Sequence, residues 1–320
     1  MGELHNVLTV KNLSVSYDDV KIVRDVTFSL KKGEFLGIVG ESGCGKTTML
    51  RALMMLRKGN SSISGTVQFQ NRELTELSEE ELRRLRGADI SMIPQNASIS
   101  MDPTKTISAL FYETIRMHGE KISRKESNRR AAEIMEALLL SHTDRILKSY
   151  PFELSGGMCQ RVMIAAAMIN NPQLMLGDEP TSALDVNSQL QVIKQLKMLK
   201  ENFHISLVVI SHNLGVISNI SDQIAIMYGG RIVEYGPCDQ VLKTPLHPYT
   251  KALIAAVPDA DGNISKGLAG VPPIFEKDMR GCPFAERCSH CLESCRTELP
   301  GDTLVGKAHS VQCFRVKEWI

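Results

Sequence analysis

The segment Gly40–Thr47 constrains the fold of this chain more than any other stretch. Its eight residues read Gly-Glu-Ser-Gly-Cys-Gly-Lys-Thr, follow the apolar run Phe35–Val39 and precede a segment with helical periodicity. A strand, a glycine-rich turn and a helix in this order are typical of a phosphate-binding loop, because glycines let several backbone N–H groups converge on one anion. The alternative is a plain glycine turn, which the complete match in this context disfavours.

Each residue type in this loop suits a nucleoside triphosphate. Lys46 can reach the β- and γ-phosphates as a point charge, and the Thr47 hydroxyl is a suitable ligand for Mg²⁺. The helix that begins here directs the positive end of its dipole at the same anion. We therefore expect a nucleoside triphosphate to bind at the loop residues, which are Gly40, Ser42, Gly43, Cys44, Gly45, Lys46, Thr47 and Thr48.

Length and composition indicate a globular protein. The chain has 320 residues, of which 43% are hydrophobic, and this suits one large or two medium domains. Its net charge of +1 gives no global reason to expect a nucleic-acid partner. No apolar run approaches the length of about 18 residues that a membrane-spanning helix needs, and the N-terminal segment lacks a signal-peptide pattern. The sequence predicts a cytosolic protein unless a partner holds it at a membrane.

Three buried-type apolar runs end in residues that can carry chemistry. Phe35–Val39 leads into the glycine loop, Leu174–Leu176 leads to Asp178, and Leu207–Ile210 leads to His212. Continuous apolar runs that alternate with helices are typical of a parallel sheet, which gathers its chemistry at the carboxyl ends of the strands. The sequence therefore predicts an α/β fold in which these strand ends share one site.

Other segments predict the elements around this core. Alternating residues between about 7 and 35 indicate short strands, whereas residues 106–147 carry helical periodicity and indicate an inserted helical subdomain. Two strand-like runs joined by Gly229-Gly230 predict a β-hairpin. Ser78, with Glu81 three residues later, predicts a capped helix.

The segment Leu154–Arg161 reads LSGGMCQR and precedes a helical run. Alone it fits either a helix cap with a glycine hinge or a second anion site at a helix N-terminus. Its position decides between them, because it follows a phosphate loop and stands about twenty residues before the acidic pair Asp178-Glu179.

With this order of motifs the chain resembles the ATP-binding subunits of ATP-binding cassette (ABC) transporters over nearly its whole length. The matching pieces are the phosphate loop, Gln95 of the Q-loop, the signature at 154–161, Leu174–Glu179 as Walker B, residues 182–185 as the D-loop, and His212 as the switch histidine. Two positions depart from the family, since Cys159 stands where a long polar residue is common and Asn213 stands where aspartate is frequent. Neither position carries the chemistry.

Physical roles agree with this resemblance. Asp178 can bind Mg²⁺, and Glu179 can orient or deprotonate the attacking water. His212 can donate to the γ-phosphate, and Gln95 can contact Mg²⁺ or the water and report the nucleotide state to a partner. Tyr17 either stacks on adenine or is a half-buried strand tyrosine, and its position alone does not decide between the two.

The resemblance also implies partners. In this family the signature residues, here Ser155, Gly156 and Gly157, act on ATP held by the opposite subunit of a head-to-tail dimer. We therefore expect a second ABC ATPase subunit, identical or related, together with two transmembrane permease subunits and an extracellular substrate-binding protein. These partners imply a peripheral location at the cytoplasmic face of the cell membrane, and no nucleic-acid partner is expected.

The C-terminal region resembles that of oligopeptide and dipeptide importers, and nickel and metallophore importers share much of it. The resemblance rests on His247–Leu253, on Gly281–Phe284, and on the spacing of the cysteines. It implies a [4Fe–4S] cluster, with Zn²⁺ as the alternative, on Cys282, Cys288, Cys295 and Cys313. Cys291 is extra to this pattern, and His309 is expected beside the cluster rather than as a ligand.

We thus expect a phosphate-loop NTPase core of ABC-ATPase type with an antiparallel β subdomain, an inserted α-helical subdomain at about 96–170, and a C-terminal cysteine-rich extension. The predicted domains are an ABC ATPase domain at 1–237 and the extension at 238–320. The expected function is ATP hydrolysis that powers uptake of oligopeptides or dipeptides. The alternatives are a nickel or metal-chelate importer of the same family and a soluble cassette ATPase that works on nucleic acid or ribosomes.

Overall fold

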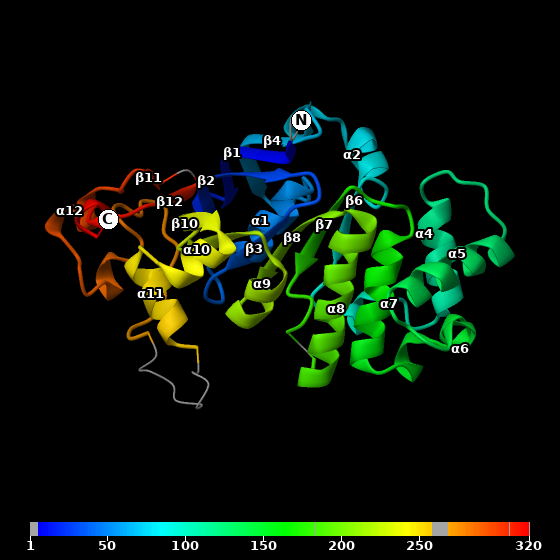
Figure 1. The fold of residues 1–320 in the computed structure, drawn as a ribbon. Helices are drawn as coiled ribbons and strands as arrows, with labels where there is room; N and C mark the ends of the chain where they lie inside the picture. The colour runs from blue at the N-terminus through cyan, green and yellow to red at the C-terminus, as the bar shows by residue number, and fades with distance from the viewer. Residues whose placement is uncertain (1–5, 183, 258–267, 307, 320) are drawn as a thin grey trace, which may run out of the picture. The chain divides into compact units, whose positions relative to one another are not determined.

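The computed structural model describes residues 6–182, 184–257, 268–306 and 308–319. The chain forms two compact units (Figure 1). Residues 1–7, 31–35 and 76–209 make up the first, here called the helical unit. Residues 8–30, 36–75 and 210–320 make up the second, here called the loop unit because it contains the glycine-rich loop.

The helical unit is built on three buried strands. In spatial order these are β8 (Ser206–Ser211), β7 (Leu174–Asp178) and β6 (Ile90–Ile93), although the last two residues of β8 belong to the loop unit. β6 and β7 run parallel, with Ile90 opposite Leu174 and Ile93 opposite Gly177. β7 and β8 are buried along their whole length, as their continuous apolar sequences predict.

Helices complete this unit, and several begin where the sequence places a cap. Their bounds are α2 (Glu79–Leu85), α3 (Ala97–Ser100), α4 (Ile107–Arg116), α5 (Arg124–Ala137), α6 (Thr143–Lys148), the 3₁₀ turn η2 (Pro151–Glu153), α7 (Gly156–Met168) and α8 (Val186–Phe203). At α2 the Ser78 hydroxyl accepts from the Glu81 N–H, and the Glu81 carboxylate accepts from the Ser78 N–H at 2.8 Å, which confirms the predicted capping box. α5 packs against α4, α6 and α7, so the predicted helical segment is present.

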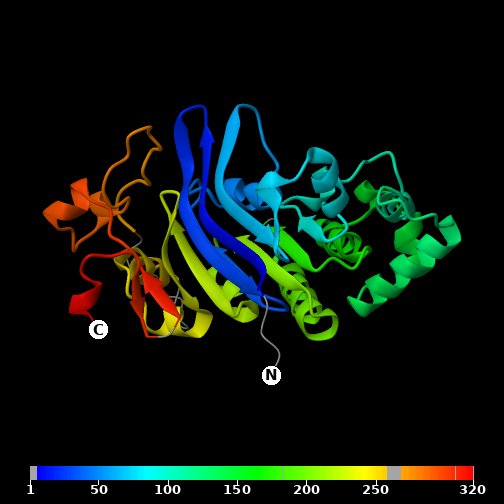
Figure 2. The ribbon, with the colours of Figure 1, turned by 90° about the horizontal axis from the view of Figure 1, so that it is seen from above.

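The loop unit contains an antiparallel sheet of four strands in the order β2-β1-β4-β5. Their bounds are β1 (Asn6–Tyr17), β2 (Val20–Lys31), β4 (Ser61–Phe69) and β5 (Arg72–Glu73), and the 3₁₀ turn η1 (Leu74–Glu76) follows. Residues 6, 7, 31 and 76, at the ends of these elements, belong to the helical unit. β1 pairs with β4 from Leu8 opposite Phe69 to Tyr17 opposite Ser61. β1 and β2 are 12 residues each, longer than the short strands that the sequence predicts (Figure 2).

The second sheet of the loop unit has the order β11-β12-β10-β9-β3. Its strands are β3 (Phe35–Val39), β9 (Gln223–Tyr228), β10 (Arg231–Pro237), β11 (Thr303–Val305) and β12 (His309–Val311). β9 and β10 form the predicted hairpin, in which Gly229 and Gly230 take positive φ angles of 53° and 81°. β3 lies parallel to β9.

Two strands of this sheet, β11 and β12, come from the C-terminal extension. β12 pairs antiparallel with β10, with Val311 opposite Glu234, and β11 pairs with β12. In Figure 2 these red strands lie beside the yellow-green hairpin. The extension therefore continues the sheet of the loop unit, which the sequence analysis did not predict. The domain boundary near residue 237 stays a prediction.

The remaining helices of the loop unit lie around these sheets. Their bounds are α1 (Lys46–Leu53), α9 (Leu214–Ile220), α10 (Cys238–Lys243), α11 (Pro248–Ala255), η3 (Ala285–Arg287), α12 (Glu293–Thr297) and η4 (Val316–Glu318). Residues 258–267 lie outside the described residues. Within the described ranges, no helix combines the length and apolar character needed to cross a bilayer.

Candidate nucleotide-binding site

The glycine-rich loop connects the end of β3 to the start of α1, as predicted. Gly43 and Gly45 have φ angles of 80° and 102°, a region that strains any residue with a Cβ atom. A Cβ atom on Gly40 would lie 2.1 Å from the carbonyl oxygen of Met227. These glycines are therefore required by the turn and by close packing against β9.

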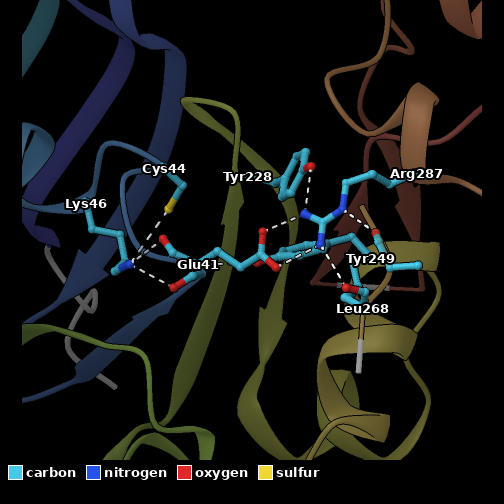
Figure 3. A network of polar contacts seen from close by, with 9 residues as sticks. Glu41, Cys44, Lys46, Tyr228, Tyr249, Leu268 and Arg287 are labelled. Atoms are coloured by element: carbon cyan, nitrogen blue, oxygen red, sulfur yellow. Dashed lines mark hydrogen bonds and ion pairs between the residues drawn. The ribbon is translucent and has the colours of Figure 1, made fainter. Parts of the chain in front are cut away.

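Lys46 lies inside this loop, and its side chain is buried. Its Nζ donates to the carbonyl oxygens of Gly40 at 2.7 Å and Glu41 at 2.8 Å (Figure 3). The Cys44 thiol also lies within contact distance of Nζ. Burial raises the pKa of Cys44, against the opposing effect of Lys46, so the thiol is a packed neutral group. Thr47 and Thr48 are the next two residues of α1.

Gln95 and Glu179 lie together in the helical unit. Gln95 follows β6 and Glu179 follows β7, and Gln95 Nε2 donates to Glu179 Oε2 at 3.4 Å. Glu179 has a φ angle of 46°, which costs a non-glycine residue about 1 kcal/mol. Asp178, the last residue of β7, is buried. The structure thus brings a carboxylate and an amide to adjacent strand ends.

The signature segment forms the start of α7. The Ser155 hydroxyl caps this helix by accepting from the Met158 N–H at 3.2 Å, and Gly156 and Gly157 form its first turn. A Cβ atom on Gly157 would lie 2.5 Å from Ser188 Oγ, whereas one on Gly156 would meet open space. Gly157 is therefore needed where α7 approaches the start of α8.

The signature helix is also tied to the Q-loop, a link that the sequence analysis missed. The buried Gln160 side chain donates to the carbonyl oxygen of Pro94, which directly precedes Gln95. Cys159 is buried too, and its thiol lies 3.3 Å from the carbonyl oxygen of Pro151. A small residue at this position therefore packs inward. In the D-loop, Ala183 lies outside the described residues, while Asp185 caps α8 by accepting from the Ser188 N–H at 3.1 Å.

The last two predicted nucleotide-site residues belong to the loop unit. His212 follows β8 and is exposed, and Asn213 caps α9 by accepting from the N–H groups of Gly215 and Val216. Asparagine and aspartate are equivalent caps, so the departure from the family pattern at Asn213 keeps the local structure. Tyr17 ends β1 with its side chain partly exposed, and both of its predicted roles stay open.

The predicted cysteines gather in the loop unit. Burial raises the pKa of Cys282 to about 12, and nearby Cys295, Cys288 and Cys313 add smaller increases. Burial likewise raises the pKa of Cys288 and Cys313. As the side chains stand, however, no three His, Cys, Asp or Glu residues of the described ranges are arranged to hold a metal ion. The geometry therefore gives the expected metal centre no support beyond the proximity of its four thiols.

The sequence analysis did not predict a site role for four residues near the loop, namely Glu41, Tyr228, Tyr249 and Arg287. They form one polar network that links the loop to the C-terminal extension (Figure 3). Glu41 and Arg287 are 246 residues apart, and no local sequence signal connects them.

The strand–loop–helix unit, the capped signature helix and the acidic end of β7 define the class of this protein as an ATP-binding cassette. A family model described as ABC transporter matches residues 23–182. A second model, oligopeptide/dipeptide transporter, C-terminal region, matches residues 233–295. The chain belongs to the family of ATP-binding subunits of oligopeptide and dipeptide ABC transporters, and it is therefore an ABC ATPase.

Relatives and solved structures agree with this assignment. The dipeptide transport ATP-binding protein DppD of Bacillus subtilis is 38% identical over 97% of this chain and 95% of its own length. The oligopeptide transport ATP-binding protein OppD of Escherichia coli is 40% identical over 92% of this chain and 89% of its own length. The dimeric post-hydrolysis structure of the cassette MJ0796, bound to ADP and Pi, is 29% identical with a TM-score of 0.64 and covers 72% of this chain and 98% of its own.

Proposed function

We propose that this protein is the ATP-hydrolysing subunit that powers uptake of oligopeptides or dipeptides through membrane permease subunits. One observation carries the proposal. The same chain combines a complete phosphate loop and a Glu179–Gln95 pair with the C-terminal region of peptide transporters. The names of the relatives, which refer to dipeptide and oligopeptide transport, support this cargo class.

In the proposed mechanism, Lys46 exchanges its bonds to the carbonyl oxygens of Gly40 and Glu41 for bonds to the β- and γ-phosphates. The loop N–H groups and the dipole of α1 bind the same phosphates. Thr47, Gln95 and Asp178 offer the hydroxyl, amide and carboxylate oxygens that Mg²⁺ prefers. When bound, Mg²⁺ neutralises phosphate charge during transfer.

Hydrolysis in this proposal depends on Glu179. The Glu179 carboxylate accepts a hydrogen bond from the Gln95 amide. A water bound beside both side chains is oriented by the Gln95 amide and can lose its proton to the Glu179 carboxylate. The hydrogen bond from Gln95 Nε2 holds this carboxylate at the end of β7. His212 donates to the γ-phosphate and stabilises the charge that develops on it.

We also propose that Ser155, Gly156 and Gly157 complete the ATP site of a second cassette subunit. The capped first turn of α7 and the open space at Gly156 suit a phosphate supplied by another chain. The remaining proposed partners are two permease subunits and an extracellular binding protein, which would hold this chain at the cytoplasmic face of the membrane. The Gln160–Pro94 bond would connect the signature helix with the Q-loop when the nucleotide state changes.

Peptide uptake by cells tests this function. A bacterial strain that lacks this subunit should fail to take up a labelled peptide, and the intact gene should restore uptake. Lys46→Met should not restore it, because the loop loses its phosphate-binding charge. The matched control is Lys105→Met, which removes an exposed lysine that pairs with Glu113. Uptake restored by Lys46→Met would overturn the proposal.

The cargo alternatives predict different results. A nickel or metal-chelate importer would restore metal uptake and leave peptide uptake unchanged. A soluble cassette ATPase acting on nucleic acid would bind DNA or RNA with a steep salt dependence. The relatives named for peptide transport favour the first function over both.

We further propose that Cys282, Cys288, Cys295 and Cys313 hold a [4Fe–4S] cluster, with Zn²⁺ as the alternative. The mutual effect of these thiols on their pKa values supports their proximity. Four thiolates are the usual ligand set of such a cluster. As they stand, the side chains of the described residues do not form a group that could hold a metal ion. His309 is proposed to lie beside the cluster rather than to be a ligand, and the contact of its ring with Glu234 supports this.

A further inference from the structure

Every polar group of Glu41 has a partner within the loop unit. Its carbonyl oxygen accepts from Lys46 Nζ at 2.8 Å, and its N–H donates to the Tyr249 hydroxyl at 3.0 Å. Its carboxylate accepts two bonds from Arg287, at 2.6 Å from Nη1 and 3.0 Å from Nη2 (Figure 3). Tyr249 and Arg287 both belong to the C-terminal region that follows residue 237. This region therefore contacts Glu41 at its backbone N–H and at its side-chain carboxylate.

Arg287 itself is held firmly in place. Only 5% of its side chain is exposed, against 25% for Glu41. Nη1 also donates to the Tyr228 hydroxyl at 3.1 Å, and Nε donates to the carbonyl oxygen of Ala269 at 2.9 Å. These hydrogen bonds offset the free-energy cost of burying the charged guanidinium of Arg287. Two hydrogen bonds from one guanidinium hold the Glu41 carboxylate in a defined position.

Aromatic side chains make the support of this network rigid. The rings of Tyr228, Tyr249 and Phe284 contact one another with centroid separations of 4.5, 5.2 and 5.5 Å. All three are buried, and Phe284 directly precedes the 3₁₀ turn that ends at Arg287. Such packed aromatic groups resist displacement, so movement of Glu41 would require movement of this cluster.

The electrostatic consequence concerns the phosphates. An unpaired Glu41 carboxylate beside the loop would repel a triphosphate, and pairing with Arg287 neutralises it. The positional consequence concerns Lys46, whose bond to the Glu41 carbonyl has to be released when phosphate binds. Because Tyr249 and Arg287 hold the backbone N–H and the side chain of Glu41, they also set the orientation of its carbonyl group.

We propose that Arg287 is a positioning residue of the phosphate loop, through which the C-terminal extension sets the affinity for ATP. It acts through Glu41, by holding the loop in its phosphate-binding shape and by cancelling the charge of the carboxylate. This inference rests on the proposed binding of ATP at the loop.

Titration of the full chain with a fluorescent ATP analogue and Mg²⁺ tests the inference. Arg287→Gln should weaken binding on the order of tenfold, because it leaves a carboxylate uncompensated beside the phosphates. Glu41→Gln should bind within about threefold of the parent, since its side-chain oxygen still accepts from Arg287. The double variant should bind at least about threefold more tightly than Arg287→Gln, because the repelling charge is gone. The control Arg296→Gln breaks an exposed pair with Glu286 in the same extension and should bind as the parent does.

Kinetics separate positioning from a merely structural role. The KM for ATP of Arg287→Gln should rise while kcat at saturating ATP stays within about twofold of the parent. If Arg287→Gln does not fold, Arg287→Lys replaces it. This variant keeps the charge, loses the second hydrogen bond, and should bind about threefold more weakly. The inference is overturned if Arg287→Gln, or Arg287→Lys in its place, binds ATP as tightly as the parent. It is also overturned if the double variant binds ATP no more tightly than Arg287→Gln. Absence of ATP binding by the parent chain would instead overturn the proposed function.

Discussion

His309 Nε2 lies 2.7 Å from Oε1 of Glu234, and both side chains are buried. The same carboxylate accepts from the backbone N–H groups of Leu246 and His247 at 2.8 and 2.9 Å. Glu234 belongs to β10, and His309 belongs to β12 of the extension. One buried carboxylate therefore fastens the last strands and the segment before α11 to the sheet of the loop unit.

Removal of the imidazole should destabilise the protein strongly. His309→Ala leaves the buried Glu234 side chain without its side-chain partner, and we expect a loss of about 1–3 kcal/mol in the free energy of unfolding. Urea unfolding followed by circular dichroism measures the change. Arg296→Gln, which breaks an exposed ion pair, should cost less than about 1 kcal/mol. Equal losses for the two variants would show that the buried pair does not anchor the extension.

His247 predicts a pH dependence of stability. Burial lowers its pKa from 6.5 to about 4, against the opposing effect of Glu234. The folded state therefore stays neutral while the unfolded state binds a proton below pH 6.5, so stability is complete above this pH and falls as the pH drops towards 4. The loss approaches about 3 kcal/mol at the lower end.

His247→Asn is the matched variant for this prediction. Asparagine does not titrate. In the parent, His247 Nδ1 accepts a hydrogen bond from the Tyr249 N–H at 3.0 Å, and the asparagine side chain can accept the same bond. Urea unfolding between pH 7 and pH 4.5 should show a shallower loss of stability for the variant, because one proton fewer is taken up on unfolding. Parallel curves for parent and variant would mean that another group causes the acid sensitivity.

Glu179→Gln should separate ATP binding from hydrolysis. The amide cannot take a proton from water, so we expect turnover to fall by about 100-fold or more, while ATP still binds. A closed dimer should then accumulate, which size-exclusion chromatography with ATP detects as a shift to twice the mass. Undiminished turnover would remove Glu179 as the catalytic base.

Anaerobic purification tests the proposed metal centre. If the four thiolates hold a [4Fe–4S] cluster, the purified protein should be brown and contain about four iron and about four sulfide ions per chain. Cys282→Ser should lower the iron content, whereas the control Cys238→Ser should not, because Cys238 is a buried lone thiol whose pKa is raised to about 11. Zinc in place of iron would overturn the cluster, and a metal-free protein would overturn both.

The sequence predicts those parts of the fold that depend on local pattern. The capping box at Ser78, the hairpin at Gly229-Gly230 and the buried strand β7 all follow from a few consecutive residues. The pairing of β6 with β7, which brings Gln95 and Glu179 together, was not predicted, because the sequence does not say which strands are neighbours.

Features that depend on distant partners were not predictable in this way. β11 and β12 have three residues each, too few for a periodic signal, and they exist because β10 offers an edge for pairing. The Arg287–Glu41 pair joins residues of ordinary surface type, and only the fold buries them together.

ATP hydrolysis by the assembled transporter in lipid vesicles tests the central claim most directly. The complex contains this chain, its cassette partner, two permease subunits and the peptide-loaded binding protein. We predict that peptide-loaded binding protein raises hydrolysis above the level seen with the empty one, and that Glu179→Gln in this chain lowers that stimulated rate. The account would be contradicted if the rate of ATP hydrolysis did not change with peptide but rose when a nickel chelate or nucleic acid was added.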